Sequence, residues 1–271
     1  MKQCLVFLLT LILLALPAVA NAYDDKQQLT AAEIINKHLA AVGGKEALSK
    51  LKSRVAIGTV RKENEPEARM AIMSEAPNRV SALYVFQNYN WQLTYDKGNV
   101  IFRPTITRDA SVIEGKYRDI LATGAMFNSI SLYNLLTDAE ASDVKMEAKG
   151  TKKVKNRPAY VVEIKRGKME TLKLYFDTET FMWVRTDYGR VNFSKSMQGL
   201  TNNVTQRGED QTEVDFFFET SDFKDVDGVK LPFKFEQTIA YPLIRQKKAG
   251  TITGTISEYK HNITIDPKMF Q

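Results

Sequence analysis

Hydrophobic and polar residues change their spacing along the chain, and each change predicts a different element. Residues 5–16 form one apolar run, interrupted only by Thr10. Thr30 and Glu33 match a capping box, and the apolar residues that follow recur at helical spacing, which predicts a first helix. The two glycines at 43–44 come where that helix should end, and a second short helix is predicted over residues 45–51.

Beyond residue 53 the apolar spacing becomes two, which is typical of β-strands. Short β-branched and aromatic runs lie at 54–60, 70–73, 80–86, 91–95, 100–102, 159–164, 172–176, 182–184, 214–218, 231–235 and 251–259. Asn, Asp and Gly predict turns at 96–99, 167–168, 177–180 and 225–228. No helical segment of crossover length separates the early runs, so we predict an antiparallel meander rather than a parallel sheet.

Two stretches interrupt this strand pattern. Residues 104–115 are loop-like, and helical spacing over 117–136, broken near Gly124, predicts two short helices. Residues 192–211 are polar and predict a long hairpin loop. No repeat and no linker rich in Pro, Gly and Ser divides the chain, so a single domain over residues 23–271 is predicted.

The predicted sheet has one strongly apolar face. If the pleat is regular, twelve side chains point the same way: Leu83, Val85, Leu93, Leu172, Leu174, Phe176, Met182, Val184, Phe216, Phe218, Phe233 and Phe235. The predicted helices are too short to cover this surface, so a sheet that curls around them would enclose an apolar cavity. A filled core is the alternative, because sequence does not distinguish a core from a cavity.

The N-terminus has the three parts of a secretory signal peptide. Lys2 precedes the apolar run, and the small residues Ala20 and Ala22 follow it. We therefore expect residues 1–22 to be removed after Ala22 and the chain to be exported, with a retained N-terminal anchor as the alternative. Cleavage would also remove Cys4, the only cysteine, leaving neither a disulfide framework nor a thiol nucleophile.

Charge and motifs narrow the function classes. A formal charge of +6 over 271 residues is compatible with approach to an anionic membrane surface and equally with an ordinary solvated surface. Export argues against a nucleic-acid partner. No Gly-x-Ser-x-Gly, His-Glu-x-x-His or Walker motif is present. His38 and His261 are isolated and predict structural or surface roles rather than a metal site. We expect no cofactor and no enzyme activity, although a hydrolase built on carboxylates from distant strands stays open.

Four segments together resemble a known family. "EIINKHLAAVGGKEALSKLKS", "LKLYFDTETFMWVR", "FKDVDGVKLPFKFEQ" and "HNITIDPKMF" occur in the order found in the outer membrane lipoprotein-sorting proteins, the group related to LolA, LolB and RseB. The resemblance covers nearly the whole mature chain. It implies an α+β, mostly β fold: a strongly curved antiparallel sheet forming an incomplete half-barrel, with helices plugging its open side.

The same resemblance implies a non-catalytic carrier in a Gram-negative periplasm. Its partners would be lipid or lipoprotein acyl chains, with transient contact with a membrane or membrane protein. The cargo stays open among lipoprotein acyl groups, a phospholipid, a hopanoid-like lipid or another hydrophobic molecule. Five apolar residues beside Gly124 are predicted to form a hinged lid over the cavity: Met126, Phe127, Leu132, Leu135 and Leu136.

Two further expectations depend on this resemblance. In the carriers an early-strand arginine holds the lid through backbone carbonyls, and Arg54, Arg61 and Arg79 are the candidates here. The alternative function is an RseB-type sensor or protein-interaction module. In that case residues 192–211 and the basic cluster at 245–248 would contact a protein partner.

Overall fold

The computed structural model describes residues 29–63, 65–76, 79–96, 99–104, 111–113, 144–166, 171–192, 213–240 and 250–271. Several predicted features lie outside these residues: the signal peptide, the five lid residues, the 167–168 turn, the loop beyond Asn192 and the 245–248 cluster. No helix in the described part of the chain is long and apolar enough to span a bilayer.

Two short helices open the described chain, as the sequence predicts. They are α1 (Ala31–Ala41) and α2 (Gly44–Ser49). The capping box is confirmed, because the backbone N–H of Glu33 donates to the Thr30 hydroxyl at 3.2 Å and the Thr30 N–H donates to the Glu33 carboxylate at 2.8 Å. Gly43 and Gly44 join the helices with φ angles of 126° and 85°, which glycine adopts at little cost.

The described strands form one 13-stranded sheet in which every pairing is antiparallel, so the predicted meander is confirmed. The strands are β1 (Ser53–Lys62), β2 (Ala68–Glu75), β3 (Arg79–Val85), β4 (Asn90–Asp96), β5 (Asn99–Pro104), β6 (Ser111–Ile113), β7 (Val144–Val154), β8 (Arg157–Arg166), β9 (Leu172–Asp177), β10 (Trp183–Asn192), β11 (Glu213–Val226), β12 (Val229–Ala240) and β13 (Gly250–His261). Their order is β6-β5-β4-β3-β2-β1-β13-β12-β11-β10-β9-β8-β7.

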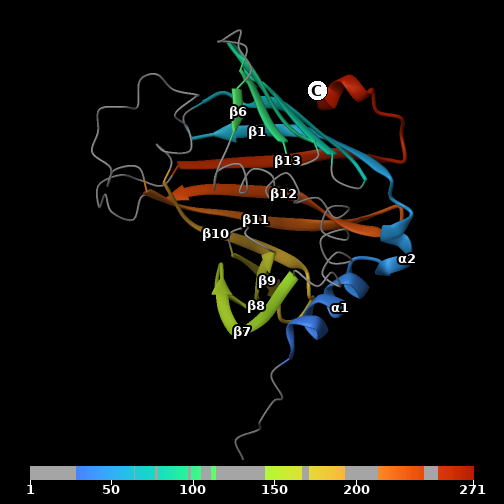
Figure 1. Cartoon of the computed structure of the whole chain (residues 1–271), viewed down its shortest axis with the longest axis vertical. Helices are drawn as coiled ribbons and strands as arrows, with labels where there is room; N and C mark the ends of the chain where they lie inside the picture. The colour runs from blue at the N-terminus through green and yellow to red at the C-terminus, as the bar shows by residue number, and fades with distance from the viewer. Residues whose placement is uncertain are drawn as a thin grey trace, which may run out of the picture.

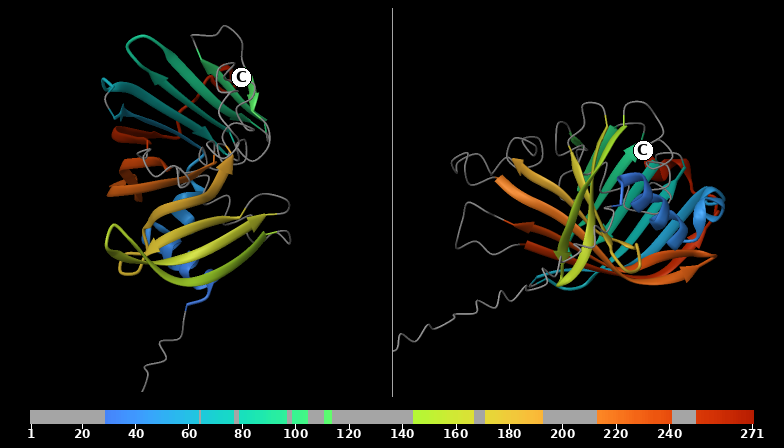
Figure 2. Two further views of the ribbon diagram at one scale, coloured as in Figure 1. Left: turned by 90° about the vertical axis from the view of Figure 1, so that its left-hand side faces the viewer. Right: turned by 90° about the horizontal axis from the view of Figure 1, so that it is seen from below.

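The first and the last strand of the chain are neighbours in the middle of this sheet. β1 pairs with β13, which joins an N-terminal group of strands to a C-terminal group (Figure 1). Figure 2 shows that the sheet twists across its width, so that β7–β9 run at an angle to β11–β13. The end strands β6 and β7 do not pair with each other within the described residues. The fold is thus mostly β, with two short helices against an open antiparallel sheet.

Helices α1 and α2 pack on one face, which we call the helix face. Their apolar residues, including Ile34, Leu39 and Leu48, form a buried core with β8, β9 and β12 residues. The backbone N–H of Lys230 on β12 donates to the Val42 carbonyl at 2.9 Å, which fixes the end of α1 to the sheet. The opposite side is called the reverse face.

A C-terminal 3₁₀-helix, η3 (Pro267–Phe270), covers the reverse face near β1–β4. Phe270 is buried against Met73 and Ile265. The Arg79 guanidinium lies 4.4 Å from the centre of the Phe270 ring, a cation–π contact. This segment gives the reverse face of the N-terminal strands a small core of its own.

Two strands were not predicted. β6 lies inside the stretch expected to be loop, so that expectation is wrong for Ser111–Ile113. β7 has the sequence VKMEAKGTKKV, in which lysines are as numerous as apolar residues. β7 is an end strand, and lysine on an end strand discourages pairing with another chain. The apolar alternation by which strands are predicted is therefore weak in this strand.

Candidate functional site

The first candidate site is an apolar surface on the helix face, formed by strands from both ends of the chain. Its members share this face by register and stay only half-buried: Ile72, Tyr84, Leu93, Phe218, Phe233, Phe235 and Ile252. We call this set the aromatic floor. Val60 and Met70 are buried among its members and complete the layer.

Ring contacts organise the aromatic floor. Phe218 stacks on Phe235, with ring centroids 5.2 Å apart, and Phe233 meets Tyr259 edge-on at 5.2 Å. Gly254 lies opposite Phe235 on β13, and any Cβ atom there would collide with the Phe235 ring. The glycine therefore lets the ring lie flat over the neighbouring strand.

The structure separates the twelve predicted cavity residues into groups. Four of them are buried on the helix face: Leu172, Leu174, Phe176 and Met182. The last three belong to the core that α1 forms with the sheet. Phe216 is buried beside Tyr188 in an edge-on ring contact, whereas Leu93, Phe218, Phe233 and Phe235 belong to the half-buried aromatic floor. Whether these residues line a ligand cavity stays a prediction.

The expectation of one common face is wrong for two of the twelve. Leu93 pairs with Ala82, so the adjacent Leu83 points to the reverse face, and Val85 does the same. A register shift between Trp183 and Arg185 breaks the alternation on β10. Val184, at this shift, packs against both the Val154 cluster and the core that contains Phe176.

The three early-strand arginines lie in different environments. Arg54 is buried on the helix face, with its guanidinium 5.3 Å from the centre of the Tyr259 ring. Burial lowers the pKa of Arg54 to about 10, and it stays charged at neutral pH. Arg61 is exposed on the reverse face, and Arg79 there pairs with Glu75 at 2.8 Å. Of the three, Arg54 alone faces the helices.

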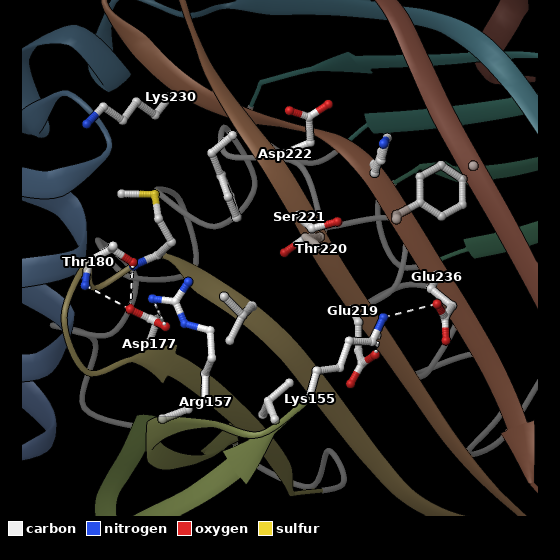
Figure 3. Close-up of a pocket in the computed structure, with 18 of the residues that line it drawn as sticks. Lys155, Arg157, Asp177, Thr180, Glu219, Thr220, Ser221, Asp222, Lys230 and Glu236 are labelled. Atoms are coloured by element: carbon white, nitrogen blue, oxygen red, sulfur yellow. Dashed lines mark hydrogen bonds and ion pairs between the residues drawn. The ribbon is translucent and has the colours of Figure 1, made fainter.

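The second candidate site is a groove of about 730 Å³. Its walls come from the β7–β8 turn, the β9–β10 turn and the reverse face of β11–β13, with the end of α1 at its edge (Figure 3). Sequence reasoning did not predict this groove, because its residues come from distant segments and match no motif, although the predicted cavity residues Met182, Val184 and Phe235 are among those that line it. We call it the reverse-face groove.

Ion pairs cross the reverse-face groove. Lys155, at the β7–β8 turn, reaches Glu219 on β11 and Glu236 on β12, each at 3.0 Å (Figure 3). The Glu219 side chain is only 8% exposed and is also 3.4 Å from Arg185. These contacts place a buried carboxylate between two cations, which offsets the loss of its hydration.

Asp177 lies at the other end of the groove. Burial raises its pKa, but hydrogen bonds from Thr180 and Glu179, together with Arg157 at 2.9 Å, outweigh burial and leave the pKa below its usual value. Its carboxylate accepts from the Thr180 N–H at 2.9 Å and the Glu179 N–H at 3.2 Å. Asp177 is thus a structural residue of the β9–β10 turn.

The two histidines make different contacts. His38 is buried in α1, with Nδ1 2.8 Å from the Phe181 carbonyl oxygen. His261 Nδ1 lies 2.8 Å from an Asp227 carboxylate oxygen. The described residues contain no group of three His, Cys, Asp or Glu side chains placed to hold a metal ion.

Comparison with known proteins adds information on the fold only. No protein-family model matches the sequence, and no curated protein matches it. Among solved structures, an outer membrane lipoprotein-sorting protein domain from Vibrio parahaemolyticus aligns with a TM-score of 0.52 at 9% identity, covering 89% of this chain and 95% of the other.

Two further structures give the same result. A LolA superfamily protein from Nitrosomonas europaea aligns with a TM-score of 0.52 at 11% identity, covering 90% of this chain and 98% of its own. A protein of a family of unknown function from Desulfovibrio piger aligns at 0.51 and 9% identity, covering 89% and 97%. The chain is therefore similar in fold to the LolA superfamily of outer membrane lipoprotein-sorting proteins.

Proposed function

We propose that this protein is an exported, non-catalytic carrier or binding protein for acyl chains, lipoprotein-linked or from another lipid, acting in a Gram-negative periplasm. The observation that carries the proposal is the aromatic floor, an apolar surface that stays half-buried in a fold similar to the LolA superfamily. Each CH₂ group that an acyl chain buries there contributes about 0.8 kcal/mol.

The finer features of the carrier belong to the same proposal. The sheet curves into an incomplete half-barrel, and the five apolar residues from Met126 to Leu136 close over the aromatic floor as a lid. Arg54 takes the lid-holding role, because it alone among the early-strand arginines faces the helices. A lid that closes over the empty floor competes with cargo, which permits release.

Matched isoleucine variants test the acyl site. Ile252 is half-buried in the aromatic floor, whereas Ile57 is 38% exposed on the reverse face. Ile252→Glu should weaken binding of a fluorescent acyl probe at least about tenfold, because a carboxylate replaces an apolar contact with the alkyl chain. Ile57→Glu should leave binding unchanged.

Fluorescence titration gives both affinities, and circular dichroism checks that the variants fold. Equal losses of affinity in the two variants would contradict an acyl site on the helix face. So would full binding by a correctly folded Ile252→Glu variant.

A further inference from the structure

Three hydrogen-bond donors form a row on the reverse face. Lys234 on β12 pairs in register with Ser221 on β11 and Thr255 on β13, and all three residues are exposed and line the reverse-face groove. Neighbouring strands are about 4.8 Å apart, so one ammonium and two hydroxyl groups lie within reach of a single anion. We call Ser221, Lys234 and Thr255 the donor row.

The charged side chains that line the groove balance formally, with Lys155, Arg157, Lys230 and Lys234 against Asp177, Glu219, Asp222 and Glu236. Lys155 and Arg185 neutralise the adjacent Glu219 and Glu236, as described above. Asp222 pairs with Lys224 at 3.4 Å, and Asp177 pairs with Arg157. Within the described residues, Lys230 and Lys234 are the charged side chains of the groove that have no ion pair. Lys234 therefore gives the donor row a cation that an anionic group can pair with.

The opposite wall of the groove is apolar. Val154, Ala159 and Val184 line it, and they pack together in a small cluster with Val161 and Tyr175. Figure 3 shows Lys155 extending from this wall towards Glu219 and Glu236, with Ser221 further along β11. A volume of about 730 Å³ lies in the range of small-molecule sites. A ligand that fits both walls has a charged head and an apolar body.

We propose that the reverse-face groove is a second binding site, for an amphipathic anion. The carboxylate or phosphate head lies on the donor row, and the alkyl part lies along Val154, Ala159 and Val184. A fatty acid and an anionic phospholipid share this chemistry. The donor row is on the face of β11–β13 opposite the aromatic floor, although Phe235 of the floor also borders the groove, and the proposal does not depend on the proposed carrier function.

Methyl NMR on the full mature chain tests the proposal at each site separately. The Val154 and Val184 methyl groups report on the groove, and the Ile252 methyl groups report on the aromatic floor. The probes are decanoate, dihexanoylphosphatidylglycerol and decanol, which has the chain without the charge. Lys234→Gln removes the cation of the donor row. Lys165→Gln is the control, because Lys165 is an exposed lysine on β8 without an ion pair in the described chain.

Decanoate, phosphatidylglycerol or both should shift the Val154 and Val184 signals, and decanol should not. Whichever anion binds more tightly identifies the source of the head group. Lys234→Gln should weaken this binding about tenfold, the usual scale for one charge-assisted hydrogen bond, and Lys165→Gln should not. Equal shifts with decanol, no shift with either anion, or unchanged affinity in Lys234→Gln would each overturn the proposal. Shifts confined to Ile252 would overturn it too and leave the carrier function standing.

Discussion

His38 joins the first helix to the sheet through one buried polar contact. Its Nδ1 lies 2.8 Å from the Phe181 carbonyl oxygen, and its ring centre is 5.1 Å from that of Phe176. A neutral ring with its proton on Nδ1 donates to that carbonyl. Burial lowers the pKa of His38 to about 4 and outweighs the opposite effect of its hydrogen bond to Phe181. The sequence shows only a histidine beside the apolar stripe of a helix, and it does not indicate that the ring contacts the Phe181 carbonyl.

The low pKa of His38 predicts acid sensitivity. The folded-state value of about 4 lies below the ordinary 6.5, so neutral His38 supports the fold above pH 6.5, and this contribution is lost as the pH falls towards 4. On the order of 2–3 kcal/mol of unfolding free energy should disappear through this group. Urea denaturation across this pH range should show a smaller loss for His38→Gln, and identical pH dependence in the two proteins would contradict the assignment.

At the scale of elements, the joint between α1 and α2 depends on two unequal glycines. A Cβ atom at Gly43 would collide with the carbonyl oxygen of Gly228, in the β11–β12 turn, whereas one at Gly44 meets nothing within 4 Å. Both residues have positive φ. The lack of a Cβ atom at Gly43, but not at Gly44, therefore allows the helix joint to pack against this turn.

Alanine substitutions should separate these two effects. Gly44→Ala should lower the free energy of unfolding by about 1 kcal/mol, the cost of a left-handed backbone for a residue with a side chain. Gly43→Ala should cost about 3 kcal/mol, because the helix joint must also move away from β12. Urea denaturation of the two variants measures the difference, and equal losses would count against the close contact.

Local chemistry made many elements predictable. The Thr30 and Glu33 pair predicted the start of α1, and the Asp and Gly residues predicted the β4–β5, β9–β10 and β11–β12 turns. The register of β3 was not predictable, because apolar residues of this strand occupy both faces of the sheet. An offset of one residue moves Leu83 and Val85 to the reverse face. Lysine-rich β7 lacked the hydrophobic pattern by which strands are identified.

At the scale of the whole molecule, both candidate sites depend on long-range pairing. The β1–β13 pair brings Ile72 and Ile252 onto one apolar surface, although 180 residues separate them in the numbering. The Lys155 ion pairs bring the β7–β8 turn against β11 and β12. The sequence predicted an apolar face from composition and spacing. It contained no local signal for the reverse-face groove, because the donor row is created only when three strands align.

The most direct test of the carrier function is to map where an acyl chain lies. A photoactivatable diacylglycerol is suitable, because its neutral head group gives the donor row no anion to bind. After irradiation, peptide mass spectrometry should find adducts on the aromatic floor, at residues such as Phe218, Phe233 and Ile252. Adducts confined to the reverse face, or none at a lipid concentration that labels a known carrier, would contradict an acyl-binding helix face.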